Sequence, residues 1–335
     1  MSDRLSVENL NIAFRVDGKS VPVVHDVNLT LRAGETLALV GESGSGKSVT
    51  SMALMQLLPG PPRSRVSGRA ILHDSGDTDL LALSERRMRR LRGDRVAMIF
   101  QEPLTSLNPV HQVGAQIVEA IRCHRNVGVS MARRRALELL EQVGIPEPES
   151  RLASYPHELS GGMRQRVMIA IALALEPDIL IADEPTTALD VTVQAQILDL
   201  LRDLQAQTGM AMLFITHNFG VVAEIADRTS VMYSGRVVEE GRTDDILKRP
   251  MMPYTTGLMN SVPRMETAGL GGDALETIEG FVPNPASPPP GCAFHPRCRF
   301  HVAGLCDSRQ PELETATTGH RLRCLRWREL HEGAA

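Results

Sequence analysis

The sequence feature that most limits the fold of this chain is a glycine-rich run of eight residues between an apolar stretch and a helix-like stretch. The run reads Gly41-Glu42-Ser43-Gly44-Ser45-Gly46-Lys47-Ser48. Its glycines allow tight turns in which backbone N–H groups face phosphate oxygens, and the helix that follows adds the positive end of its dipole. Lys47 supplies a positive charge and Ser48 a hydroxyl for Mg²⁺. The run therefore predicts a strand, a phosphate loop and a helix that bind a nucleoside triphosphate.

Length and charge limit the class of protein. The chain has 335 residues, enough for one large domain with an appendage or for two ordinary domains. Its net charge of −4 gives no reason to expect a nucleic-acid partner. The basic cluster over residues 86–92 is interpreted as a solvated helix face. The longest apolar run, residues 167–175, is shorter than the ~20 residues needed to cross a bilayer. Residues 1–5 lack the apolar core of a signal peptide, so we expect a cytoplasmic protein that meets a membrane only through a partner.

Apolar patterns predict an α/β fold in which strands and helices alternate over residues 1–262. Strands are expected over residues 5–16, 21–31, 95–100, 179–182, 211–216 and 229–233. Residues 111–125 and 130–143 instead show helical spacing with no strand between them. We therefore expect a mainly parallel sheet covered on both faces, with an inserted helical subdomain over about residues 103–160.

The composition changes beyond residue 262. Residues 263–291 are rich in Pro and Gly and are predicted to form a linker. Residues 292–335 are predicted to form a small C-terminal domain, packed around Trp327, that contains four of the five cysteines. These cysteines are Cys292, Cys298, Cys306 and Cys324.

Because a cytoplasmic chain should not rely on disulfides, the clustered thiols indicate a metal centre. Zinc usually takes tight C-x2-4-C pairs, which are absent here, and four cysteines also suit a [4Fe–4S] cluster. An iron–sulfur cluster, zinc and unligated thiols are the three alternatives. His295 and His301 are alternative ligands that we expect to face solvent. Cys123, far upstream, is predicted to be buried in a helix.

Two carboxylates end one of the expected strands. Asp183 and Glu184 follow residues 179–182, and ligands of parallel sheets bind at the carboxyl ends of strands. Asp183 is therefore suited to hold Mg²⁺ together with Ser48. Glu184 is suited to polarise an attacking water as a general base.

A second anion site is predicted at a helix N-terminus. Ser160 is expected to cap a helix that runs to about Leu175, with Gly161 and Gly162 in its first turn. The chain therefore contains two predicted phosphate-binding sites, the glycine-rich loop and this helix N-terminus.

In combination, these motifs resemble those of the ATP-binding cassette (ABC) ATPases over roughly residues 5–262. Leu159–Arg166 resembles the family signature. Gln101 matches the glutamine that precedes the helical subdomain, Ala188-Leu189-Asp190 matches the loop after the catalytic carboxylate, and His217 matches the switch histidine. The resemblance implies a P-loop NTPase fold of the ABC type, with a mixed sheet and a helical subdomain.

The resemblance also implies a head-to-tail dimer, with ATP held between one chain's phosphate loop and the other chain's signature. Ser160, Gly161 and Gly162 would then contact the γ-phosphate of ATP bound by the partner. Asp190 would cross the dimer interface, and an aromatic near the first strand, Phe14, would stack on adenine.

Two catalytic residues follow from the same resemblance. Gln101 would reach toward Mg²⁺ and the attacking water, and His217 would bond the γ-phosphate and orient Glu184. The chain departs from the family pattern at Met163, where Gln is usual, and at Asn218, where Asp is frequent. Neither change removes a phosphate contact or the general base, so we expect hydrolysis to survive.

A closer resemblance, to the ATPases of oligopeptide and dipeptide importers, is carried by residues 101–109, 182–196 and 253–255. Nickel importers and some opine and oligosaccharide systems share much of this pattern. The resemblance continues into the C-terminal cysteines, where the peptide-importer subfamily carries a [4Fe–4S] cluster.

The implied function is ATP hydrolysis that energises the uptake of di- and oligopeptides, at the cytoplasmic face of the inner membrane. The implied partners are two transmembrane permease subunits, a second ABC ATPase (a homodimer being the alternative) and, indirectly, an extracytoplasmic solute-binding protein. Uptake of nickel, opines or oligosaccharides is an alternative, as is a cysteine tail that senses metal or redox state. A soluble ABC ATPase that acts on DNA or ribosomes is less favoured, because such proteins usually carry two cassettes, a coiled-coil insertion or a basic surface.

Overall fold

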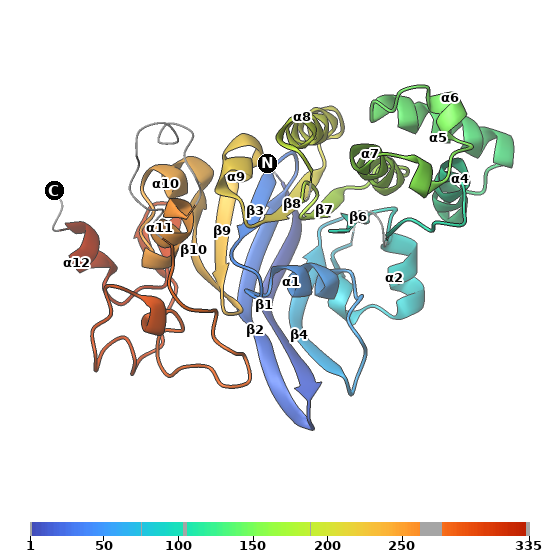
Figure 1. Cartoon of the computed structure of the whole chain (residues 1–335). Coiled ribbons are helices and arrows are strands. Elements are labelled where there is room, and N and C mark those ends of the chain that lie inside the picture. Colours follow the sequence, from blue (N-terminus) through green and yellow to red (C-terminus); the bar gives the residue numbers. More distant parts are fainter. Residues whose placement is uncertain (1, 75, 103–105, 188, 262–276, 333–335) are drawn as a thin grey trace, which may run out of the picture. The chain divides into compact units, whose positions relative to one another are not determined.

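The computed structural model describes residues 2–74, 76–102, 106–187, 189–261 and 277–332, which form two compact units. The first unit consists of residues 1–4, 31–35 and 82–215, and the second of residues 5–30, 36–81 and 216–335. Figure 1 labels their helices and strands. Each unit is built from segments that are far apart in the sequence.

The first unit contains a layer of parallel strands. Its strands, in spatial order, are β8 (Ala211–Thr216), β7 (Ile179–Asp183) and β6 (Val96–Ile99). Every residue of β7 and β8 is buried, which is the pattern of parallel strands covered on both faces. The carboxyl end of β7 therefore delivers Asp183 to one edge of the layer.

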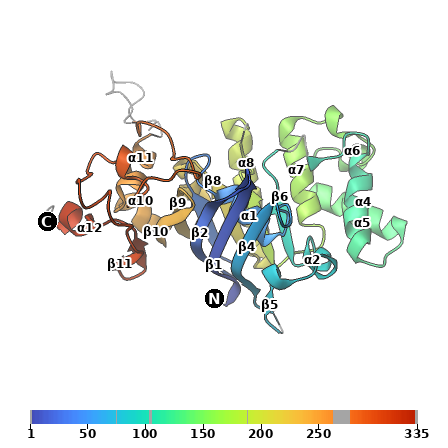
Figure 2. The same ribbon diagram turned by 90° about the horizontal axis from the view of Figure 1, so that it is seen from below.

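The first unit also contains helices. They are α2 (Glu85–Leu91), α4 (Val113–His124), α5 (Val129–Gln142), α6 (Pro148–Arg151), α7 (Gly161–Ala172) and α8 (Val191–Thr208). Helices α4, α5 and α7 pack on one another, as Figures 1 and 2 show. The helices expected over residues 111–125 and 130–143 are confirmed by α4 and α5. In α4 the buried side chains Val113, Ile117 and Ile121 follow the helical period.

The second unit begins with a four-stranded sheet in the order β2-β1-β4-β5. The strands are β1 (Asp3–Val16), β2 (Lys19–Arg32), β4 (Ser64–Leu72) and β5 (Thr78–Asp79). A turn at Asp17 and Gly18 joins the first two, with φ angles of 48° and 77°. Positive φ at both central residues is what a two-residue hairpin turn of type I′ requires.

A mixed set of strands in the second unit positions the phosphate loop. β3 (Thr36–Val40) runs parallel to β9 (Arg228–Tyr233), which pairs antiparallel with β10 (Arg236–Arg242). β10 then pairs with β12 (His320–Leu322), and β12 with β11 (Glu314–Thr317). The helices of this unit are α1 (Lys47–Leu54), α9 (Phe219–Ile225), α10 (Thr243–Lys248), α11 (Pro253–Asn260) and α12 (Trp327–Glu332).

The C-terminal segment shares its core with the phosphate-loop strands. Phe294, Leu322 and Trp327 pack in one cluster with β3 residues Ala38 and Val40. The expectation of a separate small domain over residues 292–335 is not confirmed, because this segment adds two strands to the β9–β10 layer and joins its core. Of the predicted linker, residues 277–291 contain no helix or strand, and the remainder lies outside the described residues.

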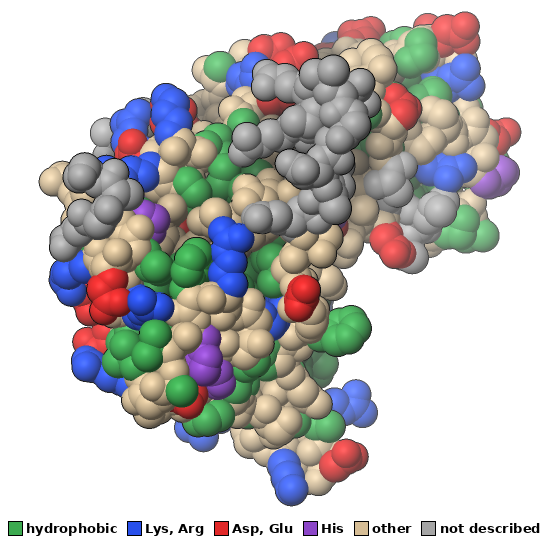
Figure 3. Space-filling view, turned by 60° about the vertical axis from the view of Figure 1, so that its left-hand side comes forward, with side chains coloured by type: hydrophobic (Ala, Val, Ile, Leu, Met, Phe, Trp, Pro, Cys, Tyr) green, Lys and Arg blue, Asp and Glu red, His purple; other side chains and the backbone are tan. Residues whose placement is uncertain are grey.

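The surface agrees with the small net charge. On the face drawn in Figure 3, basic and acidic side chains are interspersed. Within the described ranges, no helix combines the length and the apolar character needed to cross a membrane.

A pair of phenylalanine variants tests the shared core. Phe294 is 4% exposed, whereas Phe281 is 94% exposed. We expect Phe294→Ala to lower the free energy of unfolding by about 3–5 kcal/mol, because it removes a buried ring, and Phe281→Ala to change it by less than about 0.5 kcal/mol. Chemical denaturation of the full chain measures both. Equal stability of the two variants would contradict the shared core.

Candidate functional site

The phosphate loop connects β3 to α1 in the second unit, and two of its glycines are in close contact with neighbouring atoms. A Cβ atom at Gly41 would lie 2.2 Å from the carbonyl oxygen of Met232 in β9. Gly46 has a φ of 104°, and its Cβ would lie 2.9 Å from Cε of the same methionine. Only glycine fits at these two positions, so the loop can approach β9 closely.

Lys47 holds the loop from within. Its Nζ donates to the carbonyl oxygens of Gly41 at 2.6 Å and Glu42 at 3.0 Å, and its side chain is buried. The Ser45 carbonyl accepts a hydrogen bond of 2.9 Å from the Gly235 N–H in the β9–β10 turn. The ammonium group therefore lies against the backbone of the loop that is expected to bind phosphate.

Glu42 connects the loop to the C-terminal segment, a contact that the sequence motif does not reveal. Its N–H donates to the Tyr254 hydroxyl at 2.9 Å. Its carboxylate accepts two hydrogen bonds from Arg297, of 2.7 and 3.0 Å. Burial raises the pKa of Tyr254, and the hydrogen bonds with Glu42 raise the pKa of Arg297. The tyrosine hydroxyl thus stays neutral and the guanidinium stays charged at any physiological pH.

In the first unit, the structure brings Glu184 and Gln101 together. Gln101 Nε2 donates to the Glu184 carboxylate at 3.0 Å, and the Thr187 hydroxyl donates to the same oxygen at 2.8 Å. Asp183, one residue earlier, is 4% exposed at the end of β7. Thr187 was not among the residues predicted for the site, although a hydroxyl three residues after a carboxylate in a turn is a recognisable signal.

The backbone of Glu184 is in the left-handed region, with a φ of 47°. Its N–H donates to the Ile215 carbonyl of β8 at 2.9 Å, which fixes this conformation. A non-glycine residue with positive φ stores backbone strain, and such residues cluster at functional sites. The turn therefore sets the direction of the Glu184 side chain, and the strained backbone conformation costs free energy.

The predicted cap at Ser160 is confirmed. Its Oγ accepts a hydrogen bond of 3.3 Å from the Met163 N–H, and α7 begins at Gly161. Gly161 is exposed, whereas a Cβ at Gly162 would lie 2.8 Å from Cγ1 of Val193. Gly162 therefore allows close packing of α7 against α8, and Gly161 leaves the helix N-terminus open.

Asp190 and Asn218 both cap helices. Oδ1 of Asp190 accepts from the Val193 N–H at 2.9 Å, which caps α8, and Ala188 lies outside the described residues. Oδ1 of Asn218 accepts from the Gly220 N–H at 2.8 Å, which caps α9. Because an amide oxygen caps a helix as well as a carboxylate does, Asn in place of Asp at this position preserves the local fold.

His217 and Phe14 lie in the second unit. His217 is exposed directly after β8, and Phe14 is half-buried in β1, opposite Ser64 of β4. Their roles toward ATP stay predictions.

The four C-terminal cysteines line one cavity. Apolar side chains, among them Phe294 and Phe300, complete its walls. Burial, aided by repulsion from the neighbouring cysteines, raises the pKa of Cys292 to about 11 and that of Cys324 to about 12. These thiols are therefore protonated at neutral pH unless a bound cation stabilises the thiolate.

The cysteines do not converge on one point. Within the part of the chain that the structure describes, no group of three or more His, Cys, Asp or Glu side chains is arranged to hold a metal ion. His295 also lines the cavity, whereas His301 is exposed. The prediction that Cys123 is buried was wrong: its side chain is exposed on α4, because position 123 does not follow the apolar period of Ile117 and Ile121.

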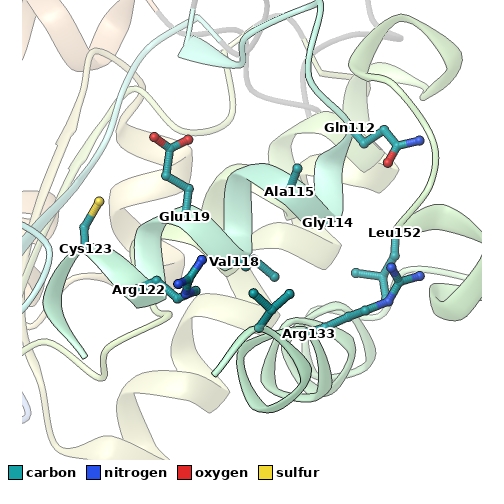
Figure 4. Close-up of a pocket in the computed structure, with 10 residues that line it drawn as sticks. Gln112, Gly114, Ala115, Val118, Glu119, Arg122, Cys123, Arg133 and Leu152 are labelled. Carbon is teal, nitrogen blue, oxygen red and sulfur yellow. The ribbon is translucent and has the colours of Figure 1, made fainter. Parts of the chain in front are cut away.

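An open groove of about 510 Å³ lies on the helical part of the first unit, as Figure 4 shows. Small residues of α4, Gly114 and Ala115, lie along it, and Glu119, Arg122 and Arg133 line its sides. The groove therefore combines small, apolar and charged side chains of both signs.

Comparison with known proteins identifies the family. Residues 24–187 match the family described as ABC transporter. The chain is 52% identical, over 97% of its length and 98% of the relative, to a protein described as a peptide import ATP-binding protein of Brucella abortus. It is 48% identical, over 97% of its length and 95% of the relative, to the dipeptide transport ATP-binding protein DppD of Bacillus subtilis. The chain belongs to the ATP-binding proteins of ABC transporters.

Solved structures agree with this assignment. The ABC protein superimposes on a dimeric ATP-binding cassette, MJ0796, that was solved in a post-hydrolysis state with ADP and phosphate, with a TM-score of 0.63 and 27% identity. The match covers 71% of this chain and 98% of the cassette. The predicted P-loop NTPase fold of the ABC type, with a mixed sheet and helices, is thereby confirmed.

A second family match extends the assignment toward the C-terminus. Residues 238–306 match the oligopeptide/dipeptide transporter C-terminal region. The match begins within β10 and includes Cys292, Cys298 and Cys306 but not Cys324. The family region therefore overlaps the ATPase strands, in agreement with the shared core.

Proposed function

We propose that this ABC protein is the ATP-binding and ATP-hydrolysing subunit of an importer that takes up dipeptides or oligopeptides. The observation that carries the proposal is the similarity over the full length to proteins named for peptide import, at 52% and 48% identity. The match to the oligopeptide/dipeptide C-terminal region supports it. The protein would act as a peripheral subunit at the cytoplasmic face of the membrane.

Within this function, the phosphate loop and Lys47 hold the phosphates of ATP, and Ser48, Gln101 and Asp183 hold Mg²⁺. His217 bonds the γ-phosphate. Ser160, Gly161 and Gly162 contact the ATP that is bound by the partner chain. Asp190 crosses the dimer interface, and Phe14 stacks on adenine. The open N-terminus of α7 at Gly161 supports the signature role, because it leaves backbone N–H groups directed outward.

Glu184 acts as the general base. Its carboxylate accepts hydrogen bonds from Gln101 and Thr187, which fix its orientation. A carboxylate held in this way can accept a proton from a water molecule in line with the γ-phosphate. Because Gln101 precedes the helical subdomain, the same hydrogen bond offers a route by which that subdomain can sense the state of the base.

The Glu184→Gln variant tests the catalytic assignment. It keeps the size of the side chain but removes the proton acceptor, so we expect the rate of ATP hydrolysis to fall by about 10²–10⁴-fold. Binding of ATP should persist and the closed dimer should be favoured. Turnover at the wild-type rate would refute the general-base role, whereas loss of ATP binding would point to a folding defect.

The partners of the subunit are part of the proposal. Two transmembrane permease subunits span the membrane, and a second ABC ATPase completes a heterodimer, with a homodimer as the alternative. A solute-binding protein outside the membrane supplies the peptide. We assign the groove along α4 to a cytoplasmic segment of a permease. The small residues of the groove allow a partner to approach closely, and its charged side chains of both signs can pair with charges on that partner.

A tryptophan variant tests the groove. Ala115 is exposed along α4, so Ala115→Trp should fill the groove without disturbing the core. We expect this variant to keep ATP binding but to lose at least about tenfold in peptide uptake and in co-purification with the permeases. Ala206→Trp, at an exposed position of α8 outside the groove, is the matched control. Wild-type uptake with Ala115→Trp would exclude the groove as the docking surface.

The cysteine cavity is proposed to hold a [4Fe–4S] cluster through Cys292, Cys298, Cys306 and Cys324. The observation that supports this proposal is that all four cysteines line one largely apolar cavity, and four cysteines are the usual ligand set of such a cluster. Zinc usually takes tight C-x2-4-C pairs, which are absent among these four cysteines. Bound there, the cluster would supply a covalent cross-link of the C-terminal segment, and zinc is the alternative.

Metal analysis tests the cavity. We expect the chain purified without oxygen to contain about four iron and four sulfide per molecule, and Cys298→Ser to lose most of both. Cys123→Ser, at an exposed cysteine outside the cavity, should retain them. Stoichiometric zinc without sulfide would show a zinc site in place of the cluster. Absence of both iron and zinc would show that the thiols are unligated.

Uptake of nickel, opines or oligosaccharides is the alternative within the same class. The ATPase does not touch the solute, so the binding protein that accompanies the permeases distinguishes these substrates.

A further inference from the structure

The phosphate loop contains one acidic side chain, Glu42. A carboxylate in a loop that binds the highly charged phosphates of ATP repels them unless a cation neutralises it. Lys47 is the cation of the loop itself, and its ammonium donates to the carbonyl oxygens of Gly41 and Glu42 and to the Ser45 hydroxyl. A cation from a distant part of the chain pairs with the Glu42 carboxylate.

Arg297 is that cation. Its two terminal nitrogens donate to the two carboxylate oxygens of Glu42, at 2.7 and 3.0 Å, from a position 255 residues away in the sequence. The Arg297 side chain is 5% exposed and that of Glu42 is 27% exposed. A forked pair of charge-assisted hydrogen bonds, largely shielded from water, is among the stronger polar contacts in proteins.

The guanidinium is itself held in place. Its Nε donates to the Glu279 carbonyl at 2.9 Å, and Nη2 donates to the Ile278 carbonyl at 3.3 Å. Its centre lies 5.9 Å from the middle of the Tyr233 ring. These contacts hold the Arg297 side chain so that its two terminal nitrogens face the phosphate loop.

A second contact with the loop comes from the same region. The Tyr254 hydroxyl accepts from the Glu42 N–H, and the Tyr254 ring packs against Phe294 with ring centres 5.4 Å apart. Phe294 and Arg297 both belong to the short segment between Cys292 and Cys298. This segment therefore supports both the side chain and, through Tyr254, the backbone of Glu42.

We propose that Arg297 is a positioning residue for ATP binding: it neutralises Glu42 and holds the phosphate loop in its binding conformation. The C-terminal segment is then part of the nucleotide site of its own chain. The proposal rests on ATP binding by the phosphate loop, and it does not depend on what the cysteines bind or on which solute is transported.

The test is a double-mutant cycle on ATP affinity, measured by titrating the purified full chain with ATP and Mg²⁺. We expect Arg297→Ala to weaken ATP binding by about tenfold or more, because it leaves an unpaired carboxylate beside the phosphates. Adding Glu42→Gln to this variant should restore most of the loss, since it removes the charge that Arg297 compensates. Arg321→Ala, which removes an ion pair between β12 and Glu240 of β10, is the matched control and should bind ATP as the wild type does.

Two results would overturn the proposal. One is wild-type ATP affinity in Arg297→Ala. The other is a loss of affinity that Glu42→Gln does not relieve, which would show that Arg297 only supports the C-terminal fold. If Arg297→Ala does not fold, Arg297→Gln, which keeps a polar side chain without the charge, takes its place with the same outcomes. Failure of ATP binding in the wild type would instead count against the function of the phosphate loop.

Discussion

The close approach of the phosphate loop to β9 is the contact on which the nucleotide site depends. Gly41 lies so near the Met232 carbonyl that any side chain would collide with it, and Lys47 holds the loop carbonyls from inside. The hydrogen bond between Gly235 and Ser45 ties the loop to the next turn of the sheet. A loop that is fixed in this way can direct several N–H groups at phosphates. It avoids the loss of conformational entropy that a flexible loop would undergo each time it bound ATP.

The C-terminal segment extends this fixed structure. It pairs β12 with β10 and β11 with β12, and it adds Phe294 and Trp327 to the core around β3. It reaches the loop through Arg297, and Phe294 packs against Tyr254, which also contacts the loop. The segment and the phosphate loop are therefore stabilised together. The cysteine cavity lies in the same segment, so whatever the cysteines bind acts on a part of the chain that touches the nucleotide loop.

Much of the fold could be predicted from the sequence, because the signals were local. Apolar runs located β3, β7 and β8, helical periods located α4 and α5, and the cap at Ser160 followed from a serine before glycines. The position of Cys123 could also have been predicted, since it lies off the apolar stripe of α4. That error came from treating cysteine as an apolar residue without applying the period.

Contacts between distant segments could not be predicted in this way. The pairing of Arg297 with Glu42 depends on how β10, α11 and the cysteine segment fold around β3, and no local sequence pattern predicts it. The β11–β12 hairpin was missed because its strands have only four and three residues, too few to show a period. For the same reason the C-terminal segment resembled a separate domain in the sequence.

The most direct test of the central claim is to purify the protein by affinity from its native membranes and to identify the proteins that accompany it by mass spectrometry. An ATPase subunit of a peptide importer should bring two polytopic membrane subunits and a second ABC ATPase, with the peptide-binding protein among the neighbouring components. Ribosomal or DNA-associated proteins without any membrane subunit would contradict the importer and leave only the ATPase chemistry.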